Sequence, residues 1–82
     1  MTRTALEKLN ETQLTFCKRL SLLIDMCRDR KDEYGKETFN YRIGNLKGYL
    51  FGLIDADIIT QSDARVLYAY FKQKNRNEEE TK

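Results

Sequence analysis

Apolar side chains recur every three or four residues along most of the 82-residue chain, a spacing typical of amphipathic helices. The first run predicts a long helix over residues 4–31. Thr4 followed by Glu7 matches a capping box, in which two side chains bond the free backbone N–H groups at a helix start. Gln13 is a polar interruption of the predicted buried stripe. The core positions of this helix are predicted to be Leu6, Leu9, Phe16, Cys17, Leu20, Leu23, Ile24 and Cys27.

Two large apolar residues, Leu22 and Met26, fall outside this stripe and lie one turn apart. The second half of the predicted first helix is therefore apolar over more than one face. Because such a helix needs two packing partners, we expect this segment to contact something besides the core. The charged run 28–37 surrounds Gly35, which we expect to end the helix at its C-terminal cap.

A second helix is predicted over residues 38–54, and it carries three glycines spaced four residues apart. Gly44, Gly48 and Gly52 therefore share one face. Each costs about 1 kcal/mol relative to alanine in a helix interior, so we expect them to allow the close approach of another backbone. That backbone is the first helix, the third helix, a second copy of the chain or an outside partner.

A third helix is predicted over residues 61–74, after a turn at 55–57. Thr60 is its expected N-cap, with Asp63 as the acidic partner three residues later. Residues 77–82 contain no apolar side chain, and we expect them to form a flexible, disordered acidic tail. The pattern predicts an all-α fold, an antiparallel three-helix domain with a long first helix, occupying residues 1–76 as a single domain.

The amino-acid composition argues against an enzymatic or metal-binding role. The chain contains no histidine, which removes the commonest general base and the commonest metal ligand. Cys17 and Cys27 are separated by roughly 15 Å along the predicted helix, too far for a disulfide, and they lack the spacing of a zinc or redox motif. The sequence therefore predicts no enzyme, no catalytic residues, no metal, no cofactor and no small-molecule substrate. Free thiols and the lack of a long apolar run predict a cytoplasmic protein that does not bind membranes.

Protein binding accounts best for the apolar surplus of the sequence. A three-helix core of this size cannot cover all of the aromatic side chains, and aromatic residues are common anchors of interfaces. Small chains with excess apolar surface often bury it by pairing with themselves, so we expect a protein partner and a homodimer. The residues predicted to form the interface are Leu22, Met26, Tyr41, Gly44, Gly48, Tyr49, Phe51 and Gly52.

Nucleic-acid binding by a small transcriptional regulator is the alternative. Residues 38–76 carry six basic and three acidic side chains, with tyrosines between them, and the second and third helices have the outline of a helix-turn-helix. Against this alternative, the net charge is +2 and the third helix has few polar residues suited to reading bases. The candidate contacts are Arg42, Lys47, Arg65, Lys72 and Lys74.

The stretch from Asn45 to Asp63, NLKGYLFGLIDADIITQSD, resembles a pattern of short proteins from phages and mobile elements of Gram-positive bacteria. In that pattern a helix ends in Leu-Leu-Asp-Ala-Gly, a cap such as Ile-Ile-Thr follows, and an acidic residue opens the next helix. Oligomerisation modules of the SHOCT type carry a similar turn. This chain has Asp57 where the pattern prefers Gly. The resemblance implies a small regulator or inhibitor that binds a host or phage protein, such as a host defence nuclease, as anti-CRISPR proteins do.

Overall fold

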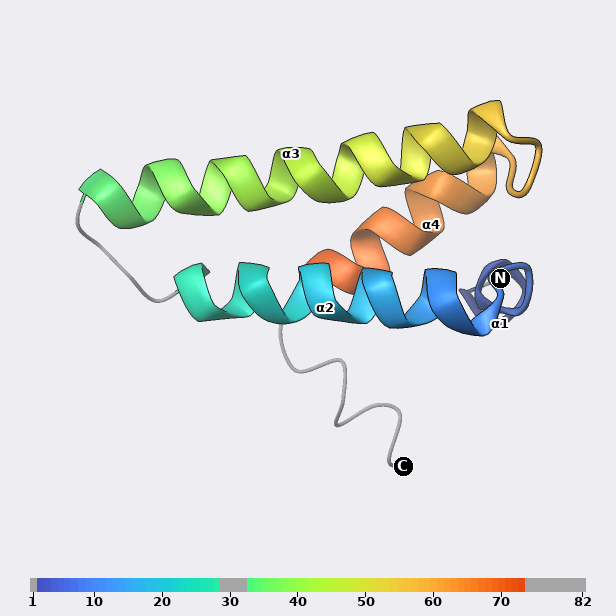
Figure 1. Ribbon diagram of the computed structural model, residues 1–82, viewed down its shortest axis with the longest axis horizontal. Coiled ribbons are helices and arrows are strands. Elements are labelled where there is room, and N and C mark those ends of the chain that lie inside the picture. The colour runs from blue at the N-terminus through green and yellow to red at the C-terminus, as the bar shows by residue number, and fades with distance from the viewer. Residues whose placement is uncertain (1, 29–32, 74–82) are drawn as a thin grey trace.

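The computed structural model describes residues 2–28 and 33–73. Within these residues every regular element is an α-helix, which confirms the all-α prediction. The predicted acidic tail at 77–82 lies outside the described residues. The elements, labelled in Figure 1, are α1 (Thr2–Glu7), α2 (Glu11–Arg28), α3 (Glu33–Asp55) and α4 (Gln61–Lys72).

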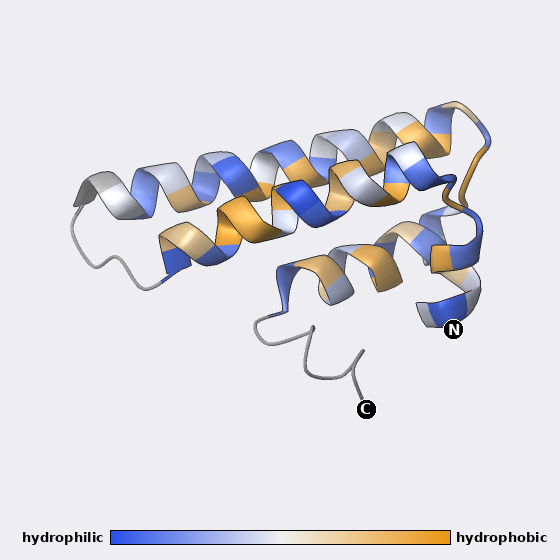
Figure 2. Ribbon diagram, turned by 60° about the horizontal axis from the view of Figure 1, so that its bottom comes forward, coloured by the Kyte–Doolittle hydropathy of each residue, from blue (hydrophilic) through white to orange (hydrophobic). Residues whose placement is uncertain are grey.

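The core lies where three helices meet. In Figure 1, α2 and α3 run antiparallel and α4 crosses behind them on a diagonal, while α1 sits at the end where α2 begins. Figure 2, which turns the molecule, shows α4 beneath the α2–α3 pair. The buried residues that form the core are Ala5, Leu9, Cys17, Leu20, Ile24, Leu46, Leu50, Leu53, Ile59, Leu67 and Phe71.

The long first helix predicted over residues 4–31 is wrong, because the chain breaks between α1 and α2. Thr4 lies inside α1 and is not its N-cap. The break is stabilised by a capping box that the periodicity concealed. The side chain of Asn10 accepts from the Gln13 backbone N–H at 2.8 Å, and the Gln13 side chain accepts from the Asn10 backbone N–H at 2.9 Å. The polar residue at position 13 is thus explained by its role in capping α2. The break between the two helices allows α1 to pack against α4.

The expected helix end at Gly35 is also wrong. Gly35 is buried inside α3, which begins at Glu33 rather than at residue 38. A glycine costs only about 1 kcal/mol in a helix interior, which is too little to end the helix by itself. The connection between α2 and α3 falls on residues 29–32, outside the described residues.

The turn between α3 and α4 forms as predicted, with Asp57 in an unusual conformation. The Asp57 N–H bonds the Ile54 carbonyl at 2.9 Å, and the Ile58 N–H bonds the Leu53 carbonyl at 3.0 Å. This pair of bonds is a Schellman motif, whose key residue takes a left-handed conformation. Asp57 has φ 61°, at the position where the resembling pattern prefers Gly.

The capping box predicted at the start of α4 is confirmed. The Thr60 hydroxyl accepts from the Asp63 N–H at 3.1 Å, and the Asp63 carboxylate accepts from the Thr60 N–H at 3.0 Å. Lys8, between α1 and α2, pairs with the same carboxylate. The hydrogen bond from Lys8, followed by that from the Thr60 backbone, lowers the pKa of the Asp63 carboxyl. The start of α4 is thereby tied to the α1–α2 connection.

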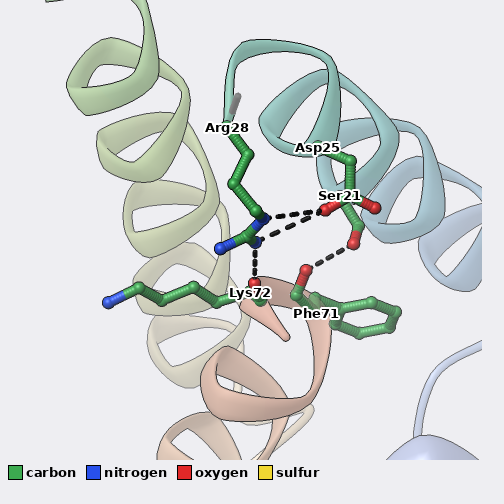
Figure 3. A network of polar contacts seen from close by, with 5 residues as sticks. All are labelled: Ser21, Asp25, Arg28, Phe71 and Lys72. Carbon is green, nitrogen blue, oxygen red and sulfur yellow. Dashed lines mark hydrogen bonds and ion pairs between the residues drawn. The ribbon is translucent and has the colours of Figure 1, made fainter. Parts of the chain in front are cut away.

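The end of α4 is held by α2 (Figure 3). The hydroxyl of Ser21, which is fully buried, donates to the Phe71 carbonyl. The guanidinium of Arg28 donates to the Lys72 carbonyl and also contacts the Asp25 carboxylate at 3.4 Å. These donors satisfy carbonyls that the last turn of a helix leaves without an intrahelical partner.

We expect Asp57→Gly to stabilise the protein. Only glycine takes a left-handed conformation without steric cost, so the substitution should raise the free energy of unfolding by about 0.5–1 kcal/mol. Urea denaturation followed by circular dichroism measures the change. Asp55→Gly is the control, because it places a glycine inside α3 and should destabilise. A loss of stability in Asp57→Gly would contradict the left-handed assignment.

We expect Ser21→Ala to destabilise the protein by about 1–3 kcal/mol, because the buried Phe71 carbonyl loses its donor. The same denaturation experiment measures the loss. Ser62→Ala is the matched control, since Ser62 is exposed in the first turn of α4. Equal stability of the two variants would show that the contact between α2 and the end of α4 contributes nothing.

Candidate protein-binding surfaces

Among residues 2–28 and 33–73, nothing covers one face of the α2–α3 pair, because α4 packs on the opposite side (Figures 1 and 2). On α2, Leu22 and Met26 are 56 % and 67 % exposed, and the helical period places them on a different side from Ser21 and Arg28, which contact α4. On α3, Tyr41 is 65 % exposed, and the same period places it about half a rotation from the core residue Leu50. We call this surface the open face. Its members among the predicted interface residues are Leu22, Met26, Tyr41, Gly48 and Gly52.

Tyr49, also a predicted interface residue, is already packed within the chain. Its ring lies 4.5 Å from that of Phe16, centroid to centroid, across the α2–α3 contact. Desolvation raises the pKa of its phenol, with a further contribution from Cys17. The same contact sets the antiparallel register, which places Met26 and Tyr41 within about one turn of each other along the helix axes. Phe16, predicted as core, is 38 % exposed at the edge of the open face.

The three glycines at 44, 48 and 52 face open space. A methyl group built at any of them meets no heavy atom within 4 Å. The sequence left four candidates for the backbone that approaches these glycines. Packing by another helix among the described residues is therefore excluded, which leaves a second copy of the chain or an outside partner. Gly44 lies at one edge of the stripe that the three glycines form along α3. It is between the open face and the side of α3 that carries Phe51.

Phe51, 62 % exposed, borders a groove between α3 and α4. The groove has a volume of about 410 Å³. We call it the α3–α4 groove. Ile54, Ala64 and Tyr68 belong to the apolar stripes of α3 and α4 but are only partly buried, because periodicity identifies an apolar stripe but not which of its edges a neighbouring helix covers. The residues that line the groove are Lys47, Leu50, Phe51, Ile54, Gln61, Ala64, Arg65 and Tyr68.

Three of the predicted nucleic-acid contacts converge on this groove. The ammonium groups of Lys47 and Lys72 lie 5.4 and 5.3 Å from the centroid of the Tyr68 ring, and Arg65 lines the groove beside them. The two lysines thus come from different helices to flank one aromatic ring.

The other two predicted nucleic-acid contacts do not join this cluster. Arg42 lies five residues before Lys47, so it projects about 140° away around α3. Its guanidinium lies over the Tyr41 ring at 5.6 Å, and its Nε is buried without a hydrogen-bond partner. Lys74 lies outside the described residues. The predicted five-residue basic surface is therefore not assembled as one patch by the described part of the chain.

Both cysteines are buried and unpaired, as the sequence predicted. Burial raises the pKa of the Cys17 thiol to about 11. A thiol with so high a pKa is a poor nucleophile. Among residues 2–28 and 33–73, no three metal-ligating side chains gather, and no helix has the length and apolarity needed to cross a membrane.

We expect Gly48→Ala to stabilise the isolated chain by about 0.5–1 kcal/mol, because the added methyl group gains helix propensity and meets no neighbour. Denaturation at low protein concentration measures this effect without self-association. Gly35→Ala is the control, because Gly35 is buried and should not share the gain. A destabilised Gly48→Ala chain would contradict the open environment of this glycine.

No protein-family model matches the chain, and neither a curated protein nor a solved structure matches it. The functional proposal therefore starts from the open face and the α3–α4 groove.

Proposed function

We propose that this chain is a small non-enzymatic protein-binding module, and that a second copy of the chain is its first partner. The observation that carries the proposal is the open face. Leu22, Met26 and Tyr41, each more than half exposed, lie on one side of the α2–α3 pair, beside Gly48 and Gly52.

Physical chemistry favours a protein partner for this face. Complete burial of a leucine or methionine side chain contributes about 1.5–3 kcal/mol, so covering Leu22, Met26 and Tyr41 together is worth several kcal/mol even when burial is partial. The bare backbone at Gly48 and Gly52 lets a partner helix approach closely. In a two-fold homodimer each such contact occurs twice, which doubles the gain.

The class of regulation follows from the resemblance of residues 45–63. We propose that the module acts in the cytoplasm as a regulator or inhibitor encoded by a phage or mobile element, with a host or phage protein as its eventual target. The confirmed α3–α4 turn supports this likeness at the level of local structure, including the left-handed position at Asp57.

We expect sedimentation equilibrium to show a reversible dimer of the wild-type chain at micromolar concentrations. Leu22→Glu and Met26→Glu should each weaken the dimer at least roughly tenfold, because each buries a charge in an apolar interface. Gly48→Leu should do the same by blocking close approach while helicity remains. The control Arg3→Glu, an exposed change on α1, should leave the dimer intact.

Circular dichroism on the same samples shows whether each variant is folded. A wild-type chain that stays monomeric at millimolar concentration would refute self-association. So would dimers that survive Leu22→Glu, Met26→Glu and Gly48→Leu with unchanged dissociation constants.

A further inference from the structure

We infer that the α3–α4 groove binds an acidic amphipathic helix from a partner protein. The apolar face of that helix would enter the groove, and its carboxylates would meet Lys47, Arg65 and Lys72. This goes beyond self-association, because it concerns a surface on another side of α3 and a partner of different chemistry.

The groove is shaped to accept apolar side chains. Leu50 is buried at its floor, and Ile54 and Ala64 are partly buried beside it. The exposed Phe51 ring and the Tyr68 ring supply its aromatic side chains. A volume of about 410 Å³ lies within the range of binding sites for drug-sized ligands and suits a few side chains that project from one face of a helix.

The two charged residues that line the groove, Lys47 and Arg65, are both basic. Neither Lys47, Arg65 nor Lys72 pairs with a carboxylate within the described residues, and none of the groove-lining residues is acidic. The contacts of both lysines with the Tyr68 ring keep their ammonium groups close to the groove. An occupant with apolar and acidic side chains therefore complements both the floor and the rim.

A protein segment fits this surface better than nucleic acid does. Leu50, Ile54 and Ala64 offer aliphatic contacts that suit side chains from a helix, and only the Phe51 and Tyr68 rings among the lining residues provide platforms on which bases stack. Three clustered cations are also few for a site that binds nucleic acid through its phosphates. DNA-binding proteins can make about six to ten phosphate contacts. Arg42, which would extend a phosphate-binding surface, projects about 140° away from Lys47 around α3, and its guanidinium lies over the Tyr41 ring.

Selection of peptides from a random helical 16-residue display library against the full-length chain tests the inference. We expect enriched peptides with apolar residues at i, i+3, i+4 and i+7 and an excess of Asp and Glu. Fluorescence anisotropy with the most enriched peptide then measures affinity. A single-stranded 20-nucleotide poly(dT) probe, measured in the same buffer, represents the nucleic-acid alternative.

Lys47→Glu and Arg65→Glu should each weaken peptide binding roughly tenfold, and Phe51→Ala should weaken it to a similar extent. The matched control Arg3→Glu reverses an exposed charge on α1 and should leave the affinity unchanged. Leu22→Glu, on the open face, should also bind the peptide normally. That last result separates the groove from self-association, so that either proposal can fail alone.

Any of four outcomes would overturn the inference. The selection would yield no binder, the selected peptides would lack acidic residues, or their affinity would be unchanged by Lys47→Glu, Arg65→Glu and Phe51→Ala. Alternatively, poly(dT) would bind more tightly than the best peptide and lose affinity in the same variants, which would assign the groove to nucleic acid.

Discussion

The contact between α2 and the C-terminal end of α4 determines which surfaces of this small protein are covered. The last carbonyls of α4 lack intrahelical partners, and two of them lie against α2, where Ser21 and Arg28 donate to them. The Arg28 guanidinium also lies 5.7 Å from the centroid of the Phe39 ring, so one side chain touches α2, α3 and α4. Because the other end of α4 is tied by Asp63 to Lys8, the diagonal of α4 across the α2–α3 pair is defined at both ends.

That diagonal divides the surface of α3 into sides with different chemistry. The side against α2 and α4 supplies Leu46 and Leu50 to the core. The flank beyond α4 becomes a cationic groove, because Lys47 is brought next to Lys72 from the other helix. The remaining side carries Tyr41 and the glycines, and none of the described residues covers it. Two surfaces of unlike character thus arise on α3 from the diagonal packing of α4.

The local features of this fold could be predicted from the sequence, because they depend on residues close in the chain. The turn after α3 and the Thr60 cap are of this kind. The break before α2 was equally local: Asn10 and Gln13 have the spacing of a capping pair, but Gln13 was interpreted as a gap in an apolar stripe. The groove could not be predicted, because the approach of Lys72 to Lys47 depends on the angle at which α4 crosses α3. The periodicity of apolar residues gives no information about that angle.

The glycines show why stability and binding have to be considered together. Within the part of the chain that the structure describes, Gly44, Gly48 and Gly52 contact no neighbour that requires a glycine, and relative to alanine they cost about 2–3 kcal/mol in total. For a domain of this size such a cost is a large share of the expected stability. Folding of the monomer alone gives no reason to place three of them one turn apart. The partner binding that we propose would give a reason, because close approach of a partner backbone would add an attraction only in the complex, and that attraction would offset a cost that the free chain bears.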